Sequence, residues 1–207
     1  MKSVTERVYL TDFILACFAY CLFVGSDSIV KYLGSDYSIV QIIFVNSWFA
    51  LIPIVLYTQT LNGWRKLKKA NFTVHFFRAL TMALALFFGY TGFYRLPMVT
   101  MYSIVFLIPL LITIGSVFFL GEVVRWKRFT AILIGFIGAI ISINPFGTEY
   151  DNYIFLALFC PIFASASYLI VRKYGFKENL FSFLIYGKIL MLVLTGVFAL
   201  FIFKPVS

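Results

Sequence analysis

Long apolar stretches separated by short polar connections dominate the chain. About twenty consecutive apolar residues form a helix that spans the hydrocarbon core of a bilayer. Seven stretches meet this measure: Tyr9–Val30, Ser38–Thr58, Phe72–Tyr94, Met98–Leu120, Phe129–Phe146, Asn152–Val171 and Phe181–Phe203. They lack the apolar–polar alternation of barrel strands, and a helix satisfies all its backbone groups internally. The pattern therefore predicts an all-α integral membrane protein, a polytopic bundle of seven transmembrane helices.

Composition supports this prediction. The 207 residues are 62% hydrophobic and 12% charged, and the mean hydropathy is +0.99. A soluble domain of this length would leave much of that apolar surface uncovered. The first apolar run continues past Ala19 without a small-residue cleavage site, so we interpret it as an uncleaved helix and not as a signal peptide.

The distribution of basic residues predicts an orientation. If the N-terminus is cytoplasmic, twelve of the 17 Lys and Arg residues lie on the inside, three lie outside, and Arg78 and Lys188 fall within apolar segments. Cytoplasmic connections carry such an excess of basic residues. We therefore expect a cytoplasmic N-terminus and, after seven crossings, a periplasmic C-terminus. The same distribution explains the net charge of +9 without nucleic acid as a partner; the expected partners are the lipid bilayer and a small-molecule substrate.

A weak internal similarity predicts a repeat. The end of the first segment, Phe23–Gly34, resembles the end of the sixth, Phe163–Gly175. If the sixth segment restarts the pattern, each repeat has five helices, and an odd number inverts the second copy in the membrane. The chain would then divide into a first five-helix repeat at 1–146 and a partial second repeat of two helices at 152–207.

Short motifs in the middle of the chain occur in a familiar order. They are Phe77-Arg78-Ala79-Leu80, Tyr94-Arg95-Leu96-Pro97, Ile108-Pro109-Leu110, Leu120-Gly121-Glu122 and Gly135-Phe136-Ile137-Gly138. With them the chain resembles the EamA-like drug/metabolite transporters, and most closely the bacterial S-adenosylmethionine uptake transporters. The resemblance implies a secondary transporter of the bacterial inner membrane that works by alternating access.

Two departures from the family pattern leave alternatives open. Family members usually have ten helices, so this chain looks truncated, and a homo-oligomer could complete the missing half in trans. Many relatives also carry an arginine in the second helix where this chain has Asn46. Export of amino acids or drugs is the alternative within the family, and a transport-incompetent remnant or assembly subunit is the alternative outside it.

Catalytic chemistry has little support in the sequence. It contains no nucleophile–base pair, metal-ligand spacing or phosphate-binding glycine loop. We therefore expect no enzyme, no catalytic residue, no metal and no cofactor.

Polar residues within the apolar segments are the candidates for the substrate pathway. A charge at the centre of a bilayer costs about 2.5–3.5 kcal/mol on insertion scales, so a retained one is a candidate for function. Asn46 and Lys188 lie deep in their segments, whereas Asp27 and Arg78 lie near the ends, where snorkelling is an equally good explanation.

Three further residues complete the candidate pathway. Tyr90 and Tyr94 lie on one helix face that could hold an organic cation, with Asp27 supplying the opposite charge for a sulfonium; ordinary packing is the competing explanation. Pro109 predicts a kink that could free carbonyl groups for a ligand.

Small residues at every fourth position predict close helix packing. Such pairs occur in the third segment, at Ala79 with Ala83 and at Ala85 with Gly89. A longer series, Ala131, Gly135 and Ala139, occurs in the fifth.

Overall fold

The computed structural model describes residues 2–60, 71–143, 152–176, 178 and 180–202, and every regular element in that part of the chain is a helix. The helices are α1 (Lys2–Leu33), α2 (Ile39–Thr60), α3 (Phe72–Arg95), α4 (Met98–Val105), α5 (Leu107–Leu120), α6 (Trp126–Ile143), α7 (Tyr153–Ala157), α8 (Phe159–Tyr174) and α9 (Leu180–Ile202). Six helical stretches are long and apolar enough to cross a bilayer, and α6 adds a shorter apolar helix at Phe129–Gly138. The predicted polytopic bundle of seven helices is confirmed. The predicted ends at Phe146 and Phe203 lie outside the described residues.

Two of the seven predicted segments are each divided into two helices. The break between α4 and α5 falls at Phe106, and the break between α7 and α8 falls at Leu158. Pro109 and Pro161 follow these breaks by three residues. Proline lacks the N–H that would bond the carbonyl four residues earlier, and its ring crowds that carbonyl. The helix is thus interrupted where Pro109 predicts a kink, and Pro161 accounts for the second break in the same way.

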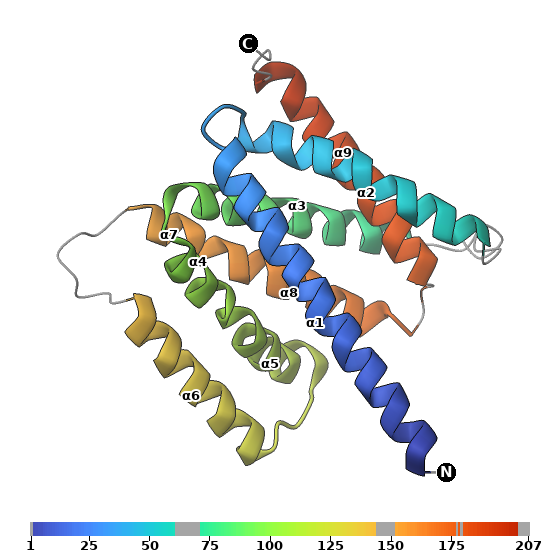
Figure 1. The fold of residues 1–207 in the computed structure, drawn as a ribbon, viewed down its shortest axis with the longest axis vertical. Helices are drawn as coiled ribbons and strands as arrows, with labels where there is room; N and C mark the ends of the chain where they lie inside the picture. The colour runs from blue at the N-terminus through green and yellow to red at the C-terminus, as the bar shows by residue number, and fades with distance from the viewer. Residues whose placement is uncertain (1, 61–70, 144–151, 177, 179, 203–207) are drawn as a thin grey trace.

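Helix α3 forms the centre of the bundle. It packs against α8 and α9 and also contacts α1, α2 and α7. In Figure 1 it runs through the middle of the molecule, with α2 and α9 on one side and α4, α5 and α6 on the other. The ends of the chain lie at opposite ends of the molecule (Figure 1), as an odd number of crossings requires.

Small residues allow this central packing. Ala79, Ala85 and Gly89 of α3 are buried. A Cβ added at Gly89 would lie 3.1 Å from the Cys160 sulfur of α8. The small-residue contacts predicted for the third segment are therefore confirmed, since a larger side chain would push α8 away.

The corresponding prediction for the fifth segment is wrong at the residues that can be examined. Ala131 and Gly135 of α6 are exposed, and a Cβ added at Gly135 would meet nothing within 4 Å. The side chain of Ala139 lies outside the described residues. Helix α6 is peripheral and packs only against α4 and α5 among the main helix contacts, so Ala131 and Gly135 have no close neighbour among the described residues.

Several buried hydroxyl groups bond a carbonyl of their own helix. Ser47 bonds the carbonyl of Ile43, Thr195 bonds that of Met191, and Thr113 bonds that of Pro109, each at 2.8 Å. These bonds to the preceding turn remove the cost of an unpaired hydroxyl in an apolar surrounding. Large apolar side chains such as Phe118 and Phe201 point outward, 79% and 84% exposed. Such a surface suits lipid and not water.

Candidate functional site

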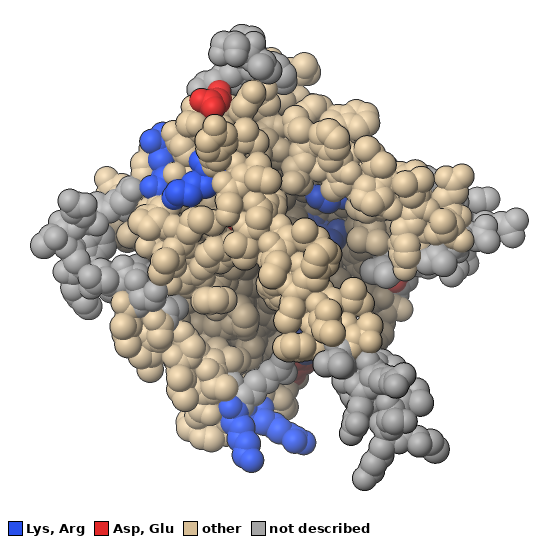
Figure 2. Space-filling view, viewed as in Figure 1, with Lys and Arg blue, Asp and Glu red and all other residues tan. Residues whose placement is uncertain are grey.

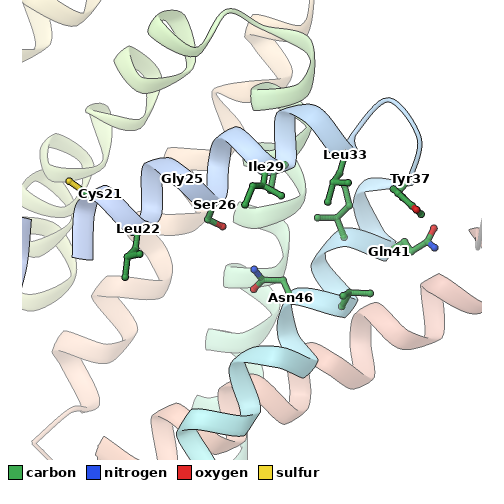
Figure 3. A pocket seen from close by; sticks show the side chains of 12 residues that line it. Cys21, Leu22, Gly25, Ser26, Ile29, Leu33, Tyr37, Gln41 and Asn46 are labelled. Atoms are coloured by element: carbon green, nitrogen blue, oxygen red, sulfur yellow. The ribbon is translucent and has the colours of Figure 1, made fainter. Parts of the chain in front are cut away.

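A cavity of about 770 Å³ lies between α1 and α2 (Figure 3). Most of its lining is apolar, and the polar side chains are Ser26, Tyr37, Gln41 and Asn46. The apolar part is formed by Cys21, Leu22, Gly25, Ile29, Val30, Leu33, Ile42 and Val45. Figure 3 shows Asn46 pointing from α2 into the space below α1. The size and the few polar groups are typical of a site for a small organic molecule.

A carboxylate lies close to this cavity, at the junction of α1, α3, α4 and α8. Asp27 of α1 accepts a hydrogen bond of 2.9 Å from the Tyr102 hydroxyl of α4. Asp27 also lies near Tyr90 of α3 and Cys160 of α8. Tyr90 of α3 lies near Ser26, which lines the cavity. Ser26 and Tyr90 thus connect the cavity to the carboxylate.

Asp27 has no basic partner in the described part of the chain. Lys31, one turn further along α1, is the nearest candidate in sequence, but its ammonium donates to the Leu96 carbonyl at 2.7 Å and the Phe93 carbonyl at 3.4 Å. A cation stabilises carbonyl groups at a helix C-terminus, which is where these two lie. Asp27 is therefore a half-buried carboxyl group held by a hydroxyl group, with no basic side chain beside it among the described residues.

The two tyrosines of the predicted aromatic face have different surroundings. Tyr90 is buried, at 7% exposure, and lies near Ser26 and Asp27. Tyr94 is half-buried, and its ring lies 4.8 Å from the Arg95 guanidinium and against Gly34. Only Tyr90 thus adjoins Asp27. Pro109 is exposed on α5, where its carbonyl accepts the Thr113 hydroxyl.

Arg78 and Lys188 form a second polar group, between α3 and α9. Arg78 Nη1 donates to the Phe183 carbonyl at 2.7 Å, and its guanidinium lies 5.4 Å from the centre of the Phe183 ring. Lys188 follows Gly187 on α9, and the Arg78 guanidinium lies against Gly187. Gly187 leaves room for the guanidinium, since an added Cβ there would collide with it. Figure 2 shows Lys or Arg atoms deep in a hollow near the middle of the visible face.

Two ion pairs involve the ends of helices away from Asp27. His75, fully buried at the start of α3, lies 3.3 Å from Glu178, which also accepts the Asn71 backbone N–H at 3.0 Å. Glu122, just after α5, pairs with Arg172 near the end of α8 at 2.6 Å. Both pairs join elements that are distant in sequence.

Several residues of this site carry no signal in the sequence. Tyr102, Ser26 and Gln41 are ordinary polar residues in a chain with 13 tyrosines. A carboxylate inside the membrane requires a hydrogen-bond donor. Which helix supplies that donor depends on how α1 packs against α3 and α4. The one signal for Tyr102 is its depth, because it is a polar residue at a depth in the fourth apolar segment similar to that of Asp27 in the first.

The arrangement offers groups that can bind a small charged molecule. Among the described residues no group of three His, Cys, Asp or Glu side chains could hold a metal ion. The cavity offers hydroxyl and amide groups, and the neighbouring carboxylate can attract a positively charged ligand. Arg78 and Lys188 can attract a negative one.

Comparison with known proteins gives consistent matches. The profile of the EamA-like transporter family matches residues 12–144. S-adenosylmethionine uptake transporters of Rickettsia felis and Rickettsia prowazekii are each 30% identical, over 83% and 79% of this chain and over 58% and 55% of their own lengths. A riboflavin transporter of Vibrio cholerae is 24% identical over 82% of this chain and 57% of its own length. The chain thus spans little more than half the length of these relatives, and no solved structure matches it significantly.

Proposed function

The chain belongs to the EamA-like transporter family, and from this membership we propose that it is a secondary transporter. It moves a small metabolite across the bacterial inner membrane by alternating access, with the N-terminus in the cytoplasm. The 1–146 and 152–207 parts act as a five-helix repeat and the first two helices of an inverted second one, with the substrate path between them. The six apolar spans and the shorter α6 support a location in the bilayer.

The proposed substrate is S-adenosylmethionine, taken up into the cell. The observation that carries this choice is Asp27, a half-buried carboxylate without a basic partner in the described chain, beside a cavity of about 770 Å³. A sulfonium ion is a cation with weak hydration, so a carboxylate and the face of a tyrosine in a low-dielectric site can replace its water. The names of the Rickettsia relatives point to the same substrate.

Asn46 lines the path at the place where relatives often have an arginine. An amide there adds no positive charge near Asp27, which favours a cationic solute. Its position in the cavity opposite α1 supports a contact with the substrate (Figure 3).

Uptake of radiolabelled S-adenosylmethionine by cells that express the chain tests this proposal. We expect saturable uptake that unlabelled S-adenosylmethionine competes away, with insertion verified by a C-terminal topology reporter. Unlabelled riboflavin serves as the second competitor, because one relative is named a riboflavin transporter. Correct insertion without uptake of either compound would contradict the proposal; competition by riboflavin alone would move it to that substrate.

A further inference from the structure

Arg78 and Lys188, between α3 and α9, have no acidic side chain beside them among the described residues. The described ion pairs are His75 with Glu178 and Arg172 with Glu122, and neither involves Arg78 or Lys188. Both side chains lie inside apolar spans. Two like charges placed together in such a surrounding repel each other and lose hydration, so a bound anion would stabilise the arrangement.

Part of the Arg78 guanidinium has no hydrogen-bond partner among the described residues. Its Nη1 is used by the Phe183 carbonyl, but its Nε is buried and has no hydrogen-bond partner among the described residues. The edge formed by Nε and Nη2 is one of those that bind a carboxylate through two parallel hydrogen bonds. The contacts of Nη1 and of the Phe183 ring hold the guanidinium in one place.

Lys188 supplies the second positive group. Its ammonium makes no hydrogen bond or ion pair with the described residues, although the side chain is half-buried and follows Gly187, which lies against the Arg78 guanidinium. Gly187 provides the space that lets the Arg78 guanidinium approach α9. The pair thus joins two helices that the proposed repeat assigns to different halves.

We propose that Arg78 and Lys188 form a binding site for the carboxylate of the transported solute. This inference rests on the proposed function and narrows its substrate class to molecules that carry both a cationic group and a carboxylate. Tyr90, beside Asp27, and Arg78 are twelve residues apart on α3, which is roughly 18 Å along a helix. The cationic and anionic groups of the solute therefore meet Asp27 and the basic pair at different depths of the path.

Binding to the purified 207-residue chain in detergent tests the site without requiring transport. The probes are S-adenosylmethionine, its decarboxylated form, which keeps the sulfonium and the amine, and L-methionine, which keeps the carboxylate. We expect the wild type to bind S-adenosylmethionine at least about tenfold more tightly than the decarboxylated form, because charge-assisted hydrogen bonds are lost. L-methionine should bind detectably to the wild type.

Variants identify the residues responsible. In Arg78→Gln and Lys188→Met the preference should fall to less than about twofold, while Lys188→Arg should retain it. Lys188→Met is the safer variant for folding, because no described hydrogen bond depends on the ammonium. Lys127→Met, at an exposed position of α6, is the matched control and should keep the wild-type preference.

Equal binding of both forms by the wild type, no binding of any probe, or an unchanged preference in both variants would overturn the carboxylate site. Measuring uptake alongside binding distinguishes failure of the carboxylate site from failure of the proposed transport function. Uptake of S-adenosylmethionine without a carboxylate preference leaves a transporter that lacks this site. Carboxylate-dependent binding without uptake leaves the site and removes the transport proposal.

Discussion

Individual charged residues inside the bundle show two different solutions to the cost of a charge in lipid. Lys31 is satisfied by two carbonyl groups at the end of α3 and acts as a structural cap. Asp27 has only a tyrosine hydroxyl, and Lys188 has no described partner. A group with incomplete partners is the more expensive one, so Asp27 and Lys188 are the stronger candidates for contact with a solute.

Replacing Asp27 by Asn tests the carboxylate without changing the size of the side chain. The amide can still accept the Tyr102 hydroxyl hydrogen bond, but it cannot attract a cation. We expect uptake of S-adenosylmethionine to fall by about tenfold or more, as for the loss of a charged hydrogen-bond partner. Initial uptake rates at equal amounts of inserted protein measure the effect. Asp12→Asn, on the exposed first part of α1, is the control, and wild-type rates for Asp27→Asn would remove Asp27 from the site.

The pair of His75 and Glu178 gives a prediction about stability. Glu178→Ala leaves the buried His75 ring and the Asn71 N–H without their acceptor, whereas Glu178→Gln keeps one acceptor oxygen. An unsatisfied buried polar group costs about 1–3 kcal/mol. The thermal unfolding midpoint in detergent should therefore fall in the order wild type, Glu178→Gln, Glu178→Ala. Equal unfolding midpoints for Glu178→Gln and Glu178→Ala would show that the acceptor oxygen at position 178 does not contribute to stability.

The sequence identifies which polar residues are unusual but not how they pair. Asp27, Arg78 and Lys188 are recognisable because a charge in an apolar segment has a known cost. The partner of Asp27 is Tyr102, 75 residues away, and the partner of Arg78 is the Phe183 carbonyl, 105 residues away. Neither distance nor residue type indicates these contacts, since they depend on the rotation and depth of each helix. The rotation and depth of α3 also place Tyr90 beside Asp27 and Tyr94 against Arg95 and Gly34.

The positions of the helices follow from signals that lie close together in the sequence. Segment length and apolarity predicted the helices, and Pro109 predicted the interruption between α4 and α5. Both signals act within a few residues of the chain. Small-residue spacing was reliable for central α3 and wrong for peripheral α6, because spacing shows that a close neighbour is possible and not that one is present.

That difference predicts unequal effects of the same substitution on two helices. Gly92→Leu would place a side chain against Met101 and Ala157, whereas Gly135→Leu would place it where nothing lies within 4 Å. Overpacking costs about 1–3 kcal/mol. We expect Gly92→Leu to lower the unfolding midpoint and the yield of monodisperse protein, and Gly135→Leu to change neither. A drop for Gly135→Leu would mean that α6 has a neighbour in the membrane that the single chain does not show.

For the whole molecule, the basic residues and the alternation of the helices should together define one orientation. Twelve Lys and Arg residues lie on the predicted cytoplasmic side and three on the other. The connection between α1 and α2, with Ser35, would face the periplasm, and Lys127 at the start of α6 would face the cytoplasm. The opposite positions of the two chain ends in Figure 1 agree with seven crossings but do not by themselves select either direction.

Cysteine labelling in intact cells measures that orientation. Cys17, Cys21 and Cys160 would first be replaced by Ala, because the first two are exposed on α1. A membrane-impermeant maleimide should then label Ser35→Cys in intact cells and Lys127→Cys only after permeabilisation. The reverse pattern would place the N-terminus outside. Asp27, near the Ser35 end of α1, would then lie towards the cytoplasm and Arg78 towards the periplasm, so a solute entering the cell would meet the basic pair before the carboxylate.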